Sequence, residues 1–181
     1  KNNFMVLKEC RLCKSRKLFK FLDLGFHPPS DQFRKENDLN DPIIHYPLKV
    51  YSCIKCGFKQ LDYVVDPKIL YQDNYPYESS LTIQGKKHYS EFAKSIIDEY
   101  KLSKNDLSID IGSNTGVLLS GFKKYKLKIL GIDPASNICK IARRRGIPTV
   151  NSFFNTSTAN KIFKKYGKAK VITGTNVFAH V

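Results

Sequence analysis

The stretch SIDIGSNTGVLL, residues 108–119, places two glycines four residues apart, directly after a short apolar run that contains an acid. A short branched apolar run is typical of a buried strand, and the residues after the second glycine carry a helical apolar spacing. We therefore predict a strand, a tight turn and a helix. Gly112 and Gly116 would let a ligand lie against the backbone of the turn.

The alternation of strand and helix continues on both sides of this turn. We expect strands at 107–112, 127–133, 147–151 and 170–176. The expected helices between them are 114–125, 136–146 with Ser136 as N-cap, and 157–167. Strand and helix in strict alternation with short connections are the signature of a parallel sheet with helices on both faces. The sequence therefore predicts an α/β fold for its C-terminal part.

Acids mark the ends of the first two predicted strands. Ligands of doubly wound sheets bind beyond the carboxyl ends of the strands, and a helix N-terminus there favours an anionic group. Asp133 follows Asp110 by 23 residues and could accept both hydroxyls of a ribose. A nucleotide or adenosyl cofactor fits this pattern. A nicotinamide dinucleotide fits less well, because Asn114 stands where its turn needs a second glycine.

Four of the five cysteines form two C-x-x-C pairs. The pairs are Cys10 with Cys13 and Cys53 with Cys56, separated by 39 residues. Each such turn presents two sulfurs to one point, so the four thiolates suit a tetrahedral cation. We predict a structural Zn²⁺ site, since four protein ligands leave no position for a substrate.

Other readings of the cysteines are disulfides and a redox C-x-x-C. His27 and His45 are alternative metal ligands, disfavoured because the four cysteines are better spaced. Cys139 lies in a half-apolar helical segment and is expected to be buried without a role.

The pattern around the cysteines divides the chain into three parts. Residues 4–66 read as a small zinc-binding β module, irregular between the knuckles apart from a strand that delivers Cys53 and its hairpin partner. Residues 67–102 read as a helical linker with an aromatic loop, YPYESS. Residues 103–181 would form the N-terminal part of the cofactor-binding domain.

Composition sets limits on function. The 181 residues carry a formal net charge of +15, and 41% are hydrophobic. Nothing approaches the roughly 20 apolar residues of a membrane span, and the start lacks the apolar core of a signal peptide, so we expect a cytoplasmic protein. The scattered lysines favour a solvated basic surface over a phosphate-bearing substrate, and make nucleic acid the least favoured partner.

The pattern D-x-G-x-x-x-G resembles motif I of the class I S-adenosylmethionine-dependent methyltransferases, and the resemblance extends to SFF at 152–154. Asn114, which we also expect to lie at the cofactor, departs from the usual glycine and weakens the motif. The resemblance places Asp110 near the methionine amino group, Gly112 and Gly116 beside the cofactor, Asp133 at the ribose, and Ser152 and Phe153 at the adenine.

The whole combination is more specific. The four-cysteine module with LGFHPPSDQF, the YPYESS loop and the segment N-V-x-x-H resemble the C-methyltransferases that act on nucleotide-linked 4-keto deoxysugars. The likeness runs over essentially the whole chain. It implies that Tyr77 contacts the sugar and that Asn176 and His180 face the reaction centre. The partner it implies is a small sugar nucleotide, while the oligomeric state stays open.

Such a reaction removes a proton beside a keto group, holds the enolate, and lets its carbon attack the methyl group of the sulfonium. The general base of the resembled family lies beyond residue 181, and four strands are fewer than the seven of a complete sheet. We therefore expect a C-terminally truncated chain that does not turn over alone. The alternatives are a methyltransferase with another acceptor, RNA or a small metabolite, and a non-catalytic module that binds S-adenosylmethionine and zinc.

Overall fold

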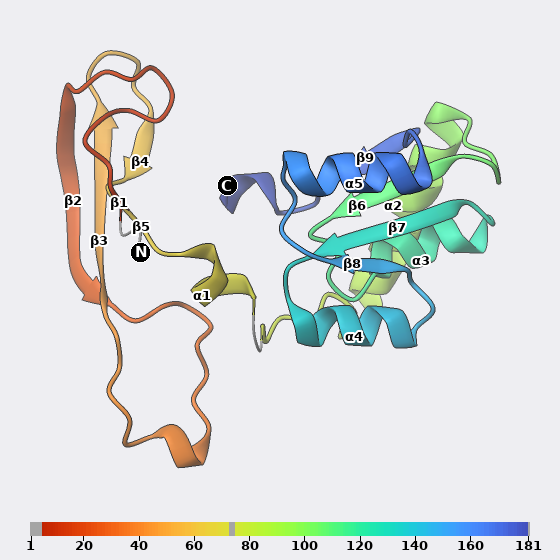
Figure 1. Cartoon of the computed structure of the whole chain (residues 1–181), viewed down its shortest axis with the longest axis horizontal. Coiled ribbons are helices and arrows are strands. Elements are labelled where there is room, and N and C mark those ends of the chain that lie inside the picture. Colours follow the sequence, from red (N-terminus) through yellow and green to blue (C-terminus); the bar gives the residue numbers. More distant parts are fainter. Residues whose placement is uncertain (1–4, 73–74, 181) are drawn as a thin grey trace. The chain divides into compact units, whose positions relative to one another are not determined.

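The structure is a computed structural model that describes residues 5–72 and 75–180. The chain divides into two compact units, residues 1–70 and residues 71–181 (Figure 1). Within the described residues, no helix is long and apolar enough to cross a membrane.

The first unit contains two small antiparallel sheets. One has the order β2-β3-β4 and the other pairs β1 with β5. Its elements are β1 (Met5–Val6), β2 (Leu18–His27), the short helix η1 (Glu36–Asp38), β3 (Tyr46–Cys53), β4 (Lys59–Leu61) and β5 (Tyr63–Val64). The predicted hairpin that delivers Cys53 is confirmed, because Ser52 of β3 pairs with Lys59 of β4.

Strand β2 is longer than the sequence indicated. We expected irregular chain between the knuckles, whereas residues 18–27 pair with β3 along their length. Two register shifts, between Lys20 and Leu22 and between Asp23 and Phe26, interrupt the pairing. Each shift breaks the period-two alternation by which a strand is recognised, which is why the strand escaped detection.

The first unit buries little apolar surface. Among its described residues, the buried hydrophobic side chains are Cys10, Tyr46 and Cys53. The phenylalanines of β2 are exposed, with Phe19 at 59% and Phe26 at 65%. Since apolar burial is the main stabilising contribution to folding, this unit needs another source of stability.

The second unit is built on a four-stranded parallel sheet. Its strands are β6 (Leu107–Ile111), β7 (Lys128–Asp133), β8 (Thr149–Asn151) and β9 (Val171–Thr173), in the order β8-β7-β6-β9. The chain runs outward from β6 to β8 and returns to β9 on the other side of β6. The order therefore reverses beside β6, which is the topological switch point of a doubly wound, Rossmann-like sheet.

Helices cover both faces of this sheet (Figure 1). They are α2 (Ile83–Tyr100), α3 (Val117–Lys124), α4 (Ser136–Arg144) and α5 (Thr156–Tyr166), preceded by α1 (Pro67–Tyr71) and followed by the short helix η2 (Phe178–His180). One hydrophobic cluster joins α2, α3 and α4, and a second joins α5 to the strands. The predicted α/β architecture is confirmed.

The helix boundaries differ by one to three residues from those expected from the sequence. The N-cap of α4 is Ala135 rather than Ser136, and α3 begins at Val117 with Gly116 as its N-cap. In α2, Ala93, Ile96 and Ile97 are buried. This helix, which the sequence placed in the linker, packs against α3 and contributes to the core of the second unit.

Candidate functional site

The four paired cysteines converge in the first unit. Their sulfur atoms all lie within 4.8 Å of one another. Among the described residues, the four cysteines form a cluster with the geometry of a metal site, and no histidine belongs to this cluster. Sγ of Cys10 lies 3.7 Å from that of Cys56, and Sγ of Cys13 lies 3.6 Å from that of Cys53. Tetrahedral Zn²⁺ with bonds of about 2.3 Å would hold its sulfurs about 3.8 Å apart. The donor set therefore fits zinc.

Both knuckles share one backbone geometry. Lys14 and Gly57 each follow a second cysteine, and their N–H groups donate to the carbonyls of Cys10 and Cys53, at 2.9 and 2.8 Å. Both residues are left-handed, with φ of 60° and 73°. Glycine favours this backbone conformation and so marks the second knuckle in the sequence, whereas a lysine in the left-handed region leaves no such mark on the first.

Gln60 of β4 connects this strand to the first knuckle, and no pattern in the sequence indicated this role. Its side chain is buried, donates to the carbonyl of Glu9 at 3.1 Å and accepts the N–H of Arg11 at 2.8 Å. The two histidines considered as ligands bond instead to nearby carbonyls, His27 to Leu24 and His45 to Ile43.

The candidate cofactor site lies where the strands of the second unit end. Asp110, in β6, is 3% exposed, and its Oδ1 accepts a hydrogen bond of 2.7 Å from Thr173 of β9. Burial raises the pKa of Asp110 to about 6, although the Thr173 bond opposes this and the nearby Asp133 adds to it. The carboxyl group is thus poised to gain from a cationic ligand.

Asp133 closes β7 and holds the turns around it. Its Oδ1 accepts the N–H of Ala135 and its Oδ2 accepts the N–H of Asn114, both at 2.9 Å. Burial raises the pKa of Asp133, and these two hydrogen bonds partly offset the rise. Each oxygen keeps a second lone pair for a further donor.

The glycine turn is filled by protein. Gly112 and Gly116 are left-handed, with φ of 64° and 77°. A Cβ on Gly112 would lie 2.5 Å from Val177, and one on Gly116 would lie 2.8 Å from Ile147. The space beside these glycines is therefore occupied by the side chains of Val177 and Ile147 in this structure. Room for a cofactor beside them stays a prediction.

The aromatic loop lies at this turn. Nδ2 of Asn114 donates to the carbonyl of Tyr77 at 2.9 Å, and its Oδ1 accepts the N–H of Ser79 at 2.9 Å. Asn137 of α4 donates to the carbonyl of Tyr75 at 2.9 Å and accepts its N–H at 3.3 Å. The ring of Tyr77 remains 56% exposed.

The remaining predicted residues follow β8 and β9. The N–H of Ser152 donates to the carbonyl of Asp133 at 3.0 Å, while its hydroxyl pairs with Thr158 at 3.0 Å. Phe153 is partly exposed. Asn176, left-handed at φ 55°, and His180 are both exposed.

Parallel strands bring these segments to one edge of the sheet. The structure joins Asp133 to the glycine turn, the aromatic loop and Ser152 through hydrogen bonds. Asn176 and His180 reach the same edge through Val177, which packs on Gly112. The contact of Val177 with Gly112 does not bring the exposed side chains of Asn176 and His180 against the two aspartates.

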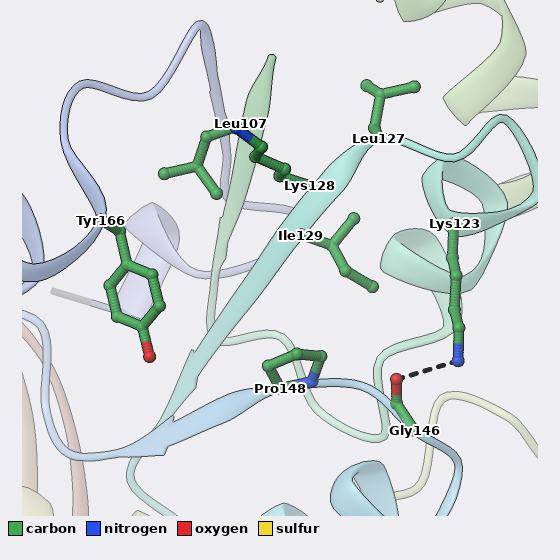
Figure 2. Close-up of a pocket in the computed structure, with 8 residues that line it drawn as sticks. All are labelled: Leu107, Lys123, Leu127, Lys128, Ile129, Gly146, Pro148 and Tyr166. Carbon is green, nitrogen blue, oxygen red and sulfur yellow. Dashed lines mark hydrogen bonds between the residues drawn. The ribbon is translucent and has the colours of Figure 1, made fainter. Parts of the chain in front are cut away.

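A hollow of about 410 Å³ lies at the opposite edge, where the strands begin (Figure 2). Leu107, Lys128 and Pro148 line it, and Lys123 donates to the carbonyl of Gly146 at 3.0 Å on its rim. The last turns of α3, α4 and α5 all carry basic residues, which complement the helix dipoles. This basic charge lies away from the strand ends that form the candidate site.

The pKa of Asp110 leads to a testable pH dependence. Because the folded-state pKa of about 6 exceeds the usual aspartate value of 3.8, the carboxyl group of the unfolded chain ionises first as pH rises. Stability is therefore lost between about pH 4 and 6, on the order of 3 kcal/mol. We expect Asp110→Asn, which keeps an acceptor for Thr173, to remove this loss.

Urea unfolding at pH 4.5 and pH 7 measures the effect as a difference between variant and parent. Asp106→Asn is the control of opposite sign, because hydrogen bonds from Ser103 lower the pKa of Asp106. If Asp110→Asn changed the free energy of unfolding by the same amount at both pH values, that result would contradict the raised pKa of Asp110.

Known proteins resemble both units. Residues 10–71 match the family Methyltransf_13, described as "Putative zinc binding domain". The chain is 27% identical over 175 residues to the C-methyltransferase NovU of Streptomyces niveus, covering 97% of this chain and 41% of that protein. It is 33% identical over 85 residues to a protein of Dictyostelium discoideum named as a methyltransferase, covering 47% of this chain and 31% of that one. The chain thus spans less than half the length of these relatives.

Similarity to solved structures is weaker. Magnesium protoporphyrin IX methyltransferase from Synechocystis PCC 6803, solved with bound SAH, aligns with a TM-score of 0.34 and 10% identity over 42% of either chain. YcgJ from Bacillus subtilis aligns with a TM-score of 0.31 and 18% identity, over 36% of this chain and 30% of that one. The description of the fold rests on the strand order itself.

Proposed function

We propose that the second unit binds S-adenosylmethionine at the strand ends, within a methyltransferase that transfers a methyl group to carbon of a nucleotide-linked 4-keto deoxysugar. The observation that carries the proposal is the buried carboxylate of Asp133, bonded to the backbone of the glycine turn at the switch point. The match to a named C-methyltransferase over 97% of the chain supports the reaction class.

The residues present suit the cofactor. Asp133 would accept the ribose hydroxyls with its second lone pairs, and Asp110 would pair with the ammonium group of the methionine part. Ser152 and Phe153 would border the adenine. The buried hydroxyls of Ser80 and Ser113 have no hydrogen-bond partner within the described residues, and buried hydroxyls usually have one. The turn and the loop beside it therefore each have a buried hydroxyl group available to hydrogen-bond a ligand.

Bound S-adenosylmethionine supplies an electrophilic methyl group on a sulfonium. Transfer of that methyl group to the carbon beside a keto group would require a base to accept the proton on this carbon and hydrogen-bond donors to hold the enolate oxygen. We assign Tyr77, Asn176 and His180 to the acceptor, as hydrogen-bonding groups that hold the enolate oxygen. Tyr77 and His180 keep exposed side chains for this contact.

The four cysteines would hold Zn²⁺ as a structural ion. Four thiolates complete a tetrahedral shell and leave no position for a substrate. Thiolate ligands must stay reduced, which favours the reducing cytoplasm as the location we propose.

Binding to the SAH-loaded chain tests the acceptor class. We expect a thymidine or uridine diphosphate-linked 4-keto-6-deoxyhexose to bind at least about tenfold more tightly than the same sugar nucleotide with a 4-hydroxyl group. Tyr77→Phe should reduce that preference, and Tyr125→Phe serves as a control with a similarly exposed ring, 44% against 56%.

The rival acceptor is RNA, which the basic charge of the chain would suit. Its signature is affinity for an RNA oligonucleotide that exceeds non-specific levels and falls steeply with salt. That result, together with equal binding of the keto and hydroxyl sugars, would contradict the proposed acceptor.

A further inference from the structure

We infer that Asn114 is a positioning residue, whose side chain holds the aromatic loop across the glycine turn and so fixes the place of Tyr77. We call residues 75–80 the aromatic strap. The contact of Tyr77 with a substrate rests on the proposed function. The attachment of the strap to the glycine turn rests only on the observed hydrogen bonds of Asn114.

The amide of Asn114 is fully engaged with the strap and the turn. Its Oδ1 accepts the N–H of Ser79 at 2.9 Å, the hydroxyl of Ser79 at 3.2 Å and the N–H of Thr115 at 2.8 Å. Its Nδ2 donates to the carbonyl of Tyr77 at 2.9 Å. Three of these four contacts cross to a segment 35 or 37 residues away. Asparagine supplies both the acceptor and the donor that this arrangement needs.

The backbone of Asn114 serves the candidate cofactor site at the same time. Its φ of 50° is left-handed, a conformation open mainly to glycine, asparagine and aspartate. Its N–H donates to Oδ2 of Asp133 at 2.9 Å. One residue therefore connects the carboxylate assigned to the ribose with the strap that carries Tyr77. A glycine here would keep the connection to Asp133 and lose the one to the strap.

A second, independent hold restrains the other end of the strap. Asn137, in the first turn of α4, bonds both the carbonyl and the N–H of Tyr75. The N–H of Ser136 donates to the carbonyl of Gln72 at 3.0 Å, just before the strap. Tyr77 thus lies between two polar attachments while its own ring stays 56% exposed. Such a strap presents a ring to a ligand at a defined place.

Amide hydrogen exchange of the purified 181-residue chain tests the hold residue by residue. Asn114→Gly keeps the left-handed backbone and the N–H donor to Asp133, so it removes only the side chain. We expect the Ser79 amide to exchange about tenfold faster, with the Tyr75 amide nearly unchanged. Asn137→Ala should show the reverse pattern. Asn114→Asp keeps an acceptor for the Ser79 N–H but sets an oxygen against the Tyr77 carbonyl, so it should restore the protection of Ser79 only in part.

Ligand binding then tests positioning. In the SAH-saturated chain, Asn114→Gly should weaken binding of the 4-keto sugar nucleotide about tenfold, the same direction as the loss expected for Tyr77→Phe, whereas Asp133→Ala should abolish SAH binding. Unchanged Ser79 exchange in Asn114→Gly, or unchanged sugar affinity with faster exchange, would overturn the inference. Failure of the parent chain to bind SAH would count against the proposed function alone, because the exchange of Ser79 still decides the hold.

Discussion

Removing the metal from the four cysteines is expected to unfold the first unit and leave the second unit folded. The described residues of the first unit bury only Cys10, Tyr46 and Cys53 among hydrophobic side chains, and both larger hydrophobic clusters lie in the second unit. Structural zinc in small domains contributes about 10–16 kcal/mol at neutral pH, as much as the whole stability of a typical domain. The first unit should therefore be folded only with its metal.

Hydrogen exchange with mass spectrometry, before and after treatment with a strong chelator, measures this directly. We expect peptides from β2 and β3 to lose protection, while those from β6 and β7 keep theirs. Cys53→Ser should have the effect of the chelator. Cys139→Ser is the matched control, because Cys139 is equally buried but belongs to α4 of the second unit and is not one of the four clustered cysteines. Protected β3 amides in metal-free chain would contradict the structural role.

Phe122→Ala is expected to cause the largest loss of stability from a single substitution in the second unit. Phe122 is fully buried in α3, in the cluster that joins α2, α3 and α4. Removing a buried phenylalanine side chain costs about 3–5 kcal/mol, through lost transfer free energy and the cavity left behind. Urea unfolding followed by circular dichroism of metal-loaded chain gives the change in the free energy of unfolding.

Phe163→Ala is the matched control on another helix of the second unit. Phe163 lies in α5 and is 53% exposed, so its removal should cost less than about 1 kcal/mol. Equal losses for the two variants would contradict the placement of α3 against the core.

Much of the second unit could be predicted because its signals are local. The four strands, the helices between them and the acid at the end of β7 follow from apolar runs, turn residues and spacing. The four-cysteine cluster was predictable for the same reason, since two C-x-x-C pairs specify a donor set without reference to the rest of the chain.

Contacts between distant segments could not be predicted in this way. Thr173 bonds Asp110 across 63 residues, and Asn137 bonds Tyr75 across 62, with no periodicity to mark either pair. Asn114 shows the consequence most clearly. In the sequence it weakens a glycine motif, whereas in the structure its amide attaches the aromatic strap. The role of a polar side chain depends on the partner that the fold brings to it.

Calorimetric titration of S-adenosylhomocysteine into the zinc-loaded chain tests the central claim most directly. NADH serves as the control ligand and Asp133→Ala as the control protein. We predict that the chain binds the adenosyl ligand and not NADH, and that Asp133→Ala abolishes this binding. Absence of binding by folded chain, or binding that survives in Asp133→Ala, would contradict a cofactor site at the ends of β6 and β7.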